Sequence, residues 1–230
     1  MKELVMNTNL LLMDLRCKDE DIIKKNGVQK GVKRLLDVII AVPLLIIASP
    51  IIGIACIAIC TESKGCPIYK QKRLGFREKY FTIYKLRTMY DHSSDGNLAA
   101  PKAADARVTR VGYILRKTSI DELPQLFNVI KGDMSILGPR AVPEGEIRLR
   151  INKLLAAYPD KEGFFRRAMH IRMLAKPGIS GMAQAYGRSS LTVEEATGYD
   201  VYYAMNYSIG LDIKIFLKTI ETVVFQRGVN

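Results

Sequence analysis

The longest apolar stretch of the chain marks a candidate membrane segment. From residue 38 to residue 60 the sequence VIIAVPLLIIASPIIGIACIAIC holds 23 positions without a charge. A bilayer core about 30 Å thick is matched by about 20 apolar helical residues, so this stretch is long enough to enter a membrane. It lies too far from the N-terminus, and is too long, to be a cleaved signal peptide. The pattern therefore predicts a membrane helix over residues 31–62.

Both flanks of this segment are basic. The lysines and arginines before it are Lys24, Lys25, Lys30, Lys33 and Arg34, and those after it are Lys64, Lys70, Lys72, Arg73, Arg77 and Lys79. Because Lys and Arg mark the cytoplasmic side of a membrane, both ends favour the same side. Pro43 and Pro50 remove backbone donors and kink a helix, while the Ser49 hydroxyl can bond a carbonyl that is freed there. These features favour a re-entrant helix, broken at Ser49 and Pro50, over the alternative of a true span.

After the apolar segment the pattern changes to short elements. Residues 67–88 alternate apolar and polar side chains around a turn at Gly75, which predicts a hairpin. Residues 91–105 have the composition of a loop, and residues 144–174 indicate one or two basic helices. From 209 to 224 apolar residues recur at spacings of three and four, which predicts an amphipathic helix. This helix either packs on its own domain or lies in a membrane interface.

These segments predict an α/β (α+β) fold class. We expect a small, mostly helical domain with one N-terminal re-entrant (monotopic) membrane helix and amphipathic interfacial helices. The predicted organisation is an N-terminal extension over residues 1–30, the re-entrant helix over residues 31–62 and a cytoplasmic domain over residues 63–230. The extension has a polar, partly amphipathic sequence to which no chemistry can be assigned.

Composition narrows the class of partner. The 230 residues include 35 Lys and Arg against 23 Asp and Glu, a formal net charge of +12, and 48% are hydrophobic. Such a chain folds, and it meets something anionic: nucleic acid, acidic lipid or a phosphorylated ligand. Four cysteines without a CxxC pair exclude a disulfide-stapled scaffold, and two histidines argue against a zinc site or a His-based triad.

The segment 109–140 holds the side chains that a phosphate-binding site needs. Asp121 and Glu122 are adjacent carboxylates, with Arg116 shortly before them and Arg140 after a Gly-Pro turn. A helix N-terminus in this region would also suit a phosphate group. The segment is therefore the candidate site of the chain's chemistry.

A purely structural role of the two carboxylates is a serious alternative. Ser119 to Glu122 fits a capping box, and acids in a first helical turn favour the helix dipole. Pro124 argues against a helix capped at Ser119, because it would occupy the fifth helical position. A helix that starts at Asp121 leaves Pro124 in the free first turn. Spacing alone leaves a cap and a catalytic pair as equal alternatives.

Six sequence blocks follow one another in an order that points to a known family. They are KRLLD (33–37), Ser49-Pro50, YKLRTM (84–89), SIDELPQLFNVIKGDMSILGPR (119–140), KPGISGMAQAYGR (176–188) and DVYY (200–203). Together they resemble the bacterial sugar transferase family, the small monotopic phosphoglycosyl transferases. The similarity covers roughly residues 30–228, which is most of the chain.

The resemblance implies a reaction at the cytoplasmic face of the bacterial cytoplasmic (inner) membrane. Members of this family transfer a sugar-1-phosphate from a UDP-sugar to undecaprenyl phosphate. The products are the undecaprenyl-diphosphate sugar and UMP, which begins the biosynthesis of a surface glycan such as a capsule or an exopolysaccharide. The family also implies a re-entrant helix, contact with anionic membrane lipid and, in some members, a homodimer. The sequence does not distinguish which sugar is transferred.

The family motif implies roles for single residues. Asp121 matches the nucleophile, which forms a covalent aspartyl phospho-sugar intermediate. Glu122 matches the partner carboxylate, and the pair is expected to bind Mg²⁺ as its cofactor. The positions expected to bind phosphate or nucleotide are Lys85, Arg116, Arg140 and Arg188, with Arg87 as a further candidate. Lys33 and Arg34 are expected at the level of the lipid headgroups.

The alternative function is a basic, membrane-associated scaffold or a nucleic-acid-binding protein without turnover. Only the net charge supports it, and no nucleic-acid-binding module is recognisable in the sequence. We therefore expect a UDP-sugar and undecaprenyl phosphate as partners, and no nucleic acid.

Overall fold

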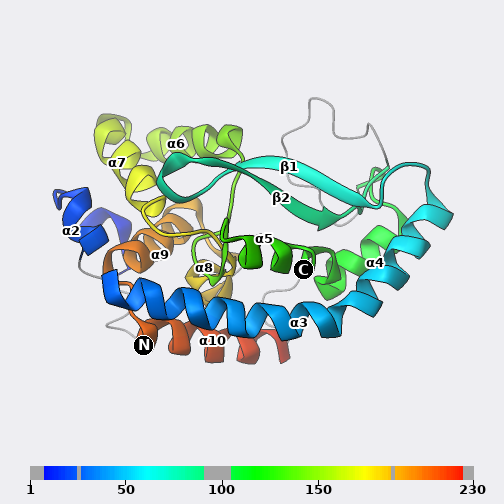
Figure 1. Cartoon of the computed structure of the whole chain (residues 1–230). Coiled ribbons are helices and arrows are strands. Elements are labelled where there is room, and N and C mark those ends of the chain that lie inside the picture. Colours follow the sequence, from blue (N-terminus) through cyan, green and yellow to red (C-terminus); the bar gives the residue numbers. More distant parts are fainter. Residues whose placement is uncertain (1–7, 25–26, 91–104, 188–189, 225–230) are drawn as a thin grey trace.

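The computed structural model of the chain describes residues 8–24, 27–90, 105–187 and 190–224 (Figure 1). Its helices are α2 Asp19–Lys24, α3 Gly27–Glu62, α4 Arg110–Thr118, α5 Gln125–Lys131, α6 Glu144–Ala157, α7 Glu162–Arg172, α8 Met182–Tyr186, α9 Val193–Asn206 and α10 Ile209–Val224, with 3-10 turns η1 Leu10–Leu12, η2 Phe76–Glu78, η3 Ile120–Glu122 and η4 Pro159–Lys161. Its strands are β1 Ile68–Leu74, β2 Tyr80–Leu86, β3 Ser135–Leu137 and β4 Gly178–Ser180. The predicted mostly helical α+β class is confirmed.

Two small sheets accompany the helices. Strands β1 and β2 form the predicted antiparallel hairpin, in a register that pairs Ile68 with Leu86 and Leu74 with Tyr80. Strands β3 and β4 form a parallel pair, which brings the chain before Gly138 beside the chain before Gly181. Figure 1 shows the hairpin crossing over α5, on the side of α5 that faces away from α3. The predicted basic stretch 144–174 forms α6 and α7.

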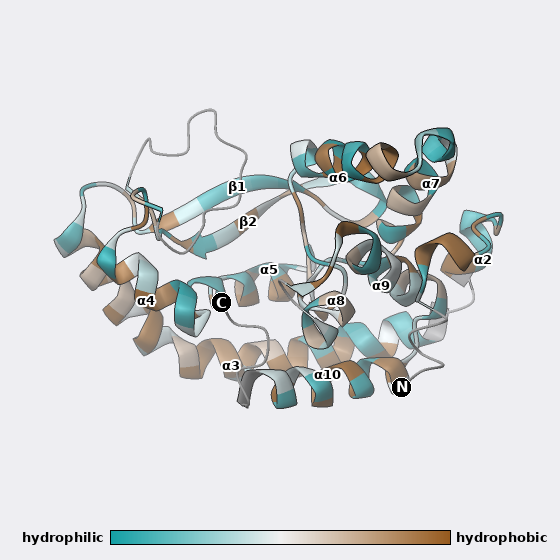
Figure 2. Ribbon diagram, turned by 180° about the vertical axis from the view of Figure 1, so that it is seen from behind, coloured by the Kyte–Doolittle hydropathy of each residue, from teal (hydrophilic) through white to brown (hydrophobic). Residues whose placement is uncertain are grey.

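The predicted membrane segment forms one helix of 36 residues, α3. In the described part of the chain, α3 is long and apolar enough to cross a membrane by length and composition. It packs on the domain through small residues at intervals of seven, Ala41, Ala48 and Ala55, which fall on one helix face. Its other face exposes large aliphatic side chains, among them Ile39, Ile46, Ile47, Ile54 and Ile57. Figures 1 and 2 show α3 bowed along one side of the domain, with apolar residues over most of its length.

The two prolines lie inside α3 without ending it. The helix is continuous through Pro43 and Pro50. The Ser49 hydroxyl donates to the carbonyl of Ile46 at 2.8 Å, and this is the carbonyl that Pro50, which has no N–H, leaves free. The predicted satisfaction of the broken ladder by Ser49 is thus confirmed. The course of α3 in a bilayer stays a prediction.

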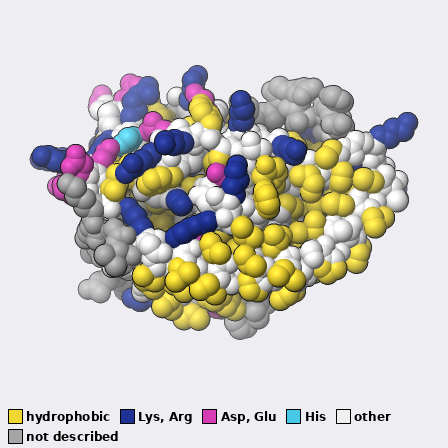
Figure 3. All heavy atoms as spheres, viewed as in Figure 1, with side chains coloured by type: hydrophobic (Ala, Val, Ile, Leu, Met, Phe, Trp, Pro, Cys, Tyr) yellow, Lys and Arg dark blue, Asp and Glu magenta, His cyan; other side chains and the backbone are white. Residues whose placement is uncertain are grey.

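Helix α10 lies along the same side of the molecule as α3 (Figures 1 and 2). It is the predicted amphipathic helix, with Ile215 fully buried and Phe216 and Leu217 about half exposed. One face therefore packs on the domain, and the other adds apolar surface beside α3. Figure 3 shows hydrophobic side chains gathered along this edge of the molecule.

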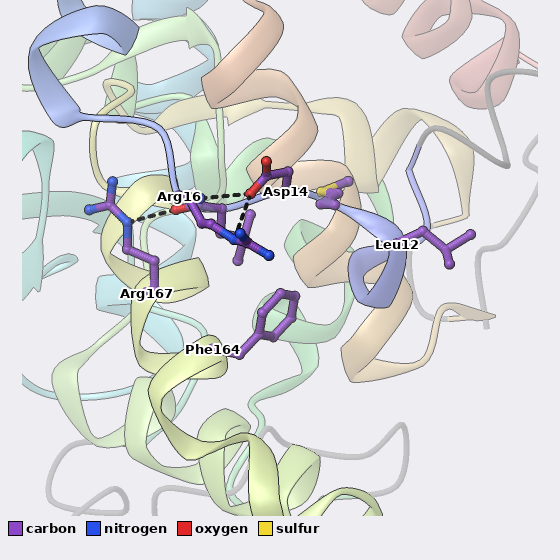
Figure 4. A pocket seen from close by; sticks show the side chains of 7 residues that line it. Leu12, Asp14, Arg16, Phe164 and Arg167 are labelled. Atoms are coloured by element: carbon purple, nitrogen blue, oxygen red, sulfur yellow. Dashed lines mark hydrogen bonds and ion pairs between the residues drawn. The ribbon is translucent and has the colours of Figure 1, made fainter.

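The described part of the N-terminal extension packs on α7 and α9. Leu10, Leu15 and Ile22 are buried in the same core as residues of α6, α7 and α9. Arg167 of α7 donates to the backbone carbonyls of Leu15 and Cys17, and His170 lies between the carboxylates of Asp19 and Glu78. Figure 4 shows the shallow hollow of about 480 Å³ between the extension and α7, lined by Leu12, Met13, Asp14, Leu15, Arg16, Phe164 and Arg167. Residues 8–24 thus contribute to the core of the domain.

Candidate active site

Asp121 and Glu122 lie in η3, a single 3-10 turn between α4 and α5. Helix α4 ends at Ser119, which adopts a left-handed conformation with φ of 57° and makes no side-chain capping bond. Helix α5 begins after Pro124, whose own side chain cannot cap it. The capping-box alternative is therefore wrong, and so is a helix that starts at Asp121. Neither carboxylate caps a helix in this turn, so both are available to the site.

Glu122 is held by two cations. Its Oε1 accepts from Lys85 Nζ at 2.6 Å and from Arg140 Nη2 at 3.3 Å. The Glu122 and Lys85 side chains are only 19% and 16% exposed. Burial alone would raise the pKa of Glu122, but the charges of Arg140 and Lys85 outweigh burial and lower it to about 2. Glu122 is therefore an ionised, immobilised carboxylate at neutral pH.

Asp121 has a different environment from its neighbour. No hydrogen bond or ion pair to its carboxylate occurs among the residues that the structure describes. Burial raises the pKa of Asp121, an effect that the charge of Lys85 opposes and that of Glu122 reinforces. One carboxylate is thus fixed and the adjacent one is free to react or to bind a ligand.

The structure brings together most of the predicted phosphate-binding residues. Lys85 lies on β2 and Arg140 follows β3, and both contact Glu122. Arg116, in the last turn of α4, donates through Nε to the Thr88 hydroxyl at 2.8 Å, and the charge of Asp121 acts on its pKa. Arg188 lies outside the described residues, so its predicted role is not placed.

Arg87 is not a phosphate ligand in this structure. It is buried, and it donates to the backbone carbonyls of Ser63 and Lys64 at 2.8 and 2.7 Å. These bonds tie the end of β2 to the chain that follows α3. The further candidate role of Arg87 is therefore corrected to a structural one.

Two residues that the sequence did not single out as site residues line the site. A small cavity beside Glu122 is lined by Arg73, Ile83, Lys85, Glu122, Gln125, Arg140, Ala141, Gly178 and Ile179. Arg73 was visible only as one of many basic flanking residues. Residues 73 and 81 pair across the hairpin, and 81, 83 and 85 share a strand face, so Arg73 shares a face with Lys85. Strand pairing is the signal that finds it.

The carboxylates can be compared with what Mg²⁺ requires. Among the described residues, no group of three or more His, Cys, Asp or Glu side chains is arranged to hold a metal ion. Mg²⁺ is commonly held by one or two carboxylates, with substrate phosphates and water completing its six ligands. The adjacent oxygens of Asp121 and Glu122 fit that smaller donor set, provided that a phosphorylated substrate supplies the rest.

Comparison with known proteins agrees with this geometry. The model of a family described as bacterial sugar transferase matches residues 28–226. The chain belongs to this family. The predicted family and the predicted enzyme class, a phosphoglycosyl transferase, are confirmed.

Individual relatives cover most of this chain. It is 40% identical to the uncharacterized sugar transferase EpsL of Bacillus subtilis (strain 168), over 86% of this chain and 90% of that protein. It is 38% identical to the UDP-N-acetylgalactosamine-undecaprenyl-phosphate N-acetylgalactosaminephosphotransferase of Aeromonas hydrophila, over 86% of this chain and 44% of that protein. It is also 38% identical to the UDP-glucose:undecaprenyl-phosphate glucose-1-phosphate transferase of Klebsiella pneumoniae, over 89% and 42%. The chain thus spans less than half the length of the latter two proteins.

Proposed function

We propose that this protein transfers a sugar-1-phosphate from a UDP-sugar to undecaprenyl phosphate, with UMP as the other product. The observation that carries the proposal is the free carboxylate of Asp121 beside Glu122, which Lys85 and Arg140 immobilise. The names of the relatives from Aeromonas and Klebsiella supply the substrate class. Because those names specify different sugars, the proposal commits to a UDP-sugar and not to one hexose.

The proposed reaction has two displacements at one phosphorus atom. An oxygen of Asp121 attacks the phosphorus that bears the sugar, and the bond from that phosphorus to the UMP oxygen breaks as UMP leaves. A phosphate oxygen of undecaprenyl phosphate then attacks the same phosphorus, and the aspartyl bond breaks, which restores the carboxylate. Two steps allow a water-soluble donor and a lipid acceptor to use one nucleophile in turn.

The basic residues around the turn support both displacements. Arg140 is half-exposed, with 48% of its side chain accessible, so it keeps donors for a ligand while it holds Glu122. Arg116 acts on Asp121 electrostatically from α4. Guanidinium groups bind phosphate oxygens in pairs and stabilise the charge that develops on a leaving phosphate. Asp121 and Glu122 are the residues that would hold Mg²⁺, which when bound offsets the negative charge of the diphosphate.

The proposal places the site at the cytoplasmic face of the inner membrane, with α3 as a re-entrant helix. Lys33, near the start of α3, pairs with Asp212 of α10 at 2.6 Å. Glu62, its last residue, accepts backbone N–H groups of Arg110 and Val111 in α4. Since both ends of α3 contact one domain, a span across the bilayer would break one set of contacts. Contact with anionic lipid and a homodimer stay predictions.

The function is tested by UMP release from purified protein in nanodiscs with undecaprenyl phosphate present. We expect release with at least one UDP-sugar of a panel that includes UDP-glucose and UDP-N-acetylgalactosamine. A scaffold or nucleic-acid-binding protein would release no UMP with any of them. Such a result, with correctly folded protein, would contradict the proposal.

Removal of divalent cations is expected to abolish UMP release. Without a cation, the carboxylates of Asp121 and Glu122 repel the donor's diphosphate, and Lys85 and Arg140 are already partly neutralised by Glu122. The measurement is UMP release after treatment with EDTA and again after addition of excess Mg²⁺. Unchanged release in EDTA would show that the reaction does not use a divalent ion.

The rate of UMP release is expected to fall in acid, because Asp121 attacks only as a carboxylate. Burial raises the pKa of Asp121, so the loss should begin at a higher pH than for an exposed aspartate. The charge of Lys85 lowers the pKa of both Asp121 and Glu122. Lys85→Met should therefore move the acid limb of the pH–rate profile to higher pH. Lys70→Met, at an exposed position of the same hairpin, should leave it unchanged.

A further inference from the structure

Helix α3 contacts each described segment that carries a proposed site residue. Near its N-terminal end, Arg34 donates to the carbonyls of Val129 and Ile130, the latter at 2.6 Å. These carbonyls are in the last turn of α5, where a helix leaves acceptors without intrahelical donors and favours a cation. Helix α5 starts directly after the turn that carries Asp121 and Glu122. Arg34 and Lys33 thus bond protein groups, in contrast to the predicted position at lipid headgroups.

Asp37, one turn further along α3, fixes the strand that leads to Arg140. Its side chain is buried, with the residue 5% exposed, and its Oδ1 accepts from the Ser135 hydroxyl and from Ile136 N, both at 3.0 Å. Ser135 and Ile136 are in β3, which runs into the Gly138-Pro139-Arg140 turn. A buried carboxylate costs free energy unless it is hydrogen-bonded, so these two bonds constrain β3 closely.

The other end of α3 holds the helix that carries Arg116. The two carboxylate oxygens of Glu62 accept from Arg110 N at 2.7 Å and from Val111 N at 2.9 Å. These N–H groups belong to the first turn of α4, which lacks intrahelical acceptors for them. Directly after α3, the carbonyls of Ser63 and Lys64 accept from Arg87, two residues past Lys85. Each end of one helix therefore positions two of the four site segments.

We propose that α3 is the frame of the active site, and that Asp37 and Glu62 are positioning residues at its two ends. Asp37 acts through β3 on Arg140, and Glu62 acts through α4 on Arg116. Neither makes a contact with Asp121, Glu122 or Lys85 in the described structure. The consequence is that the seating of the apolar helix and the spacing of the phosphate-binding arginines are linked. The activity arm of the test rests on the proposed function.

Crossed double-mutant cycles test the two assignments. Glu62→Gln keeps the side-chain shape but leaves one oxygen for two N–H donors, and Asp37→Asn makes the matched change at the other end. We expect each to slow UMP release about tenfold with little change in KM for the UDP-sugar. In an Arg116→Ala background Glu62→Gln should cost nothing further, while Asp37→Asn keeps its full effect. In an Arg140→Ala background the order should reverse.

A merely structural role of the two acids would give different results. General destabilisation would produce equal losses in both backgrounds, and that outcome would overturn the proposal. Glu195→Gln is the matched control, since Glu195 belongs to the capping box of α9, away from the site, and should leave the rate unchanged.

Hydrogen exchange supplies a measurement that does not depend on turnover. In nanodiscs, Glu62→Gln should speed exchange at the amides of Arg110 and Val111, and Asp37→Asn should speed it at Ile136, with exchange in α6 and α7 unchanged. If the wild type releases no UMP from any UDP-sugar, the proposed function fails, and the exchange pattern alone still decides the framing role of α3. Unchanged exchange at these amides would refute that role even in an active enzyme.

Discussion

Asp121→Asn is expected to lower UMP release by at least about a thousandfold, because it removes the only proposed nucleophile while the rest of the turn stays in place. An amide is isosteric with the carboxylate but does not attack phosphorus. Since Asp121 makes no described hydrogen bond, its replacement should not change the free energy of unfolding by much. The measurements are the rate of UMP release and mass spectrometry of the quenched protein after a single turnover without the lipid acceptor.

The wild type should carry one sugar phosphate on Asp121 in that experiment, and the variant none. Asp133→Asn is the matched control, because Asp133 lies shortly after α5 and pairs with the exposed Lys131 at 3.1 Å. It should retain the wild-type rate and the adduct. An adduct on another residue, or full activity of Asp121→Asn, would refute the assignment of the nucleophile.

Asp200→Leu is expected to lower the free energy of unfolding by about 3–5 kcal/mol. Asp200 of α9 pairs with Arg172 of α7 at 2.7 Å, and both side chains are almost fully buried, at 3% and 4% exposed. The variant leaves the Arg172 guanidinium buried without its counter-charge. Arg172 also donates to the carbonyl of Arg140, so the site should lose order with the core. The measurement is equilibrium unfolding in denaturant, followed by circular dichroism.

A double variant separates the buried charge from the loss of packing. Arg172→Met with Asp200→Leu removes both charges and should recover much of the lost free energy of unfolding. Arg166→Met is the surface control, because its ion pair with Glu162 is more than half exposed and should contribute about 0.5 kcal/mol or less. If Asp200→Leu were as stable as the wild type, the buried pair would have no role in holding α7 against α9.

The elements that were predicted well are those with a strong local pattern. The apolar run predicted α3, and alternation around Gly75 predicted the β1–β2 hairpin, because hydrophobic periodicity depends only on neighbouring residues. The bond from Ser49 to the carbonyl that Pro50 frees also follows from local geometry. The loop predicted over 91–105 lies almost wholly outside the described residues, as does Arg188.

Local reasoning failed where a side chain has a distant partner. Arg87, Arg34 and Lys33 were assigned to phosphate or to lipid headgroups. Each instead bonds a protein group at least 23 positions away in the chain, Arg87 to Ser63 and Lys64, and Arg34 and Lys33 to α5 and α10. A basic side chain carries no local sign of which acceptor it will meet.

The sequence by itself determined the family, the one apolar helix and the segment that holds the adjacent carboxylates, since motif order and hydrophobic pattern are properties of the linear chain. Only the tertiary structure decided how the two carboxylates differ. Lys85 comes from β2 and Arg140 from the chain after β3, and their convergence on Glu122 leaves Asp121 unpaired among the described residues. Spacing could not separate a helix cap from a reactive pair, because the difference between them depends on charges that arrive from other parts of the fold.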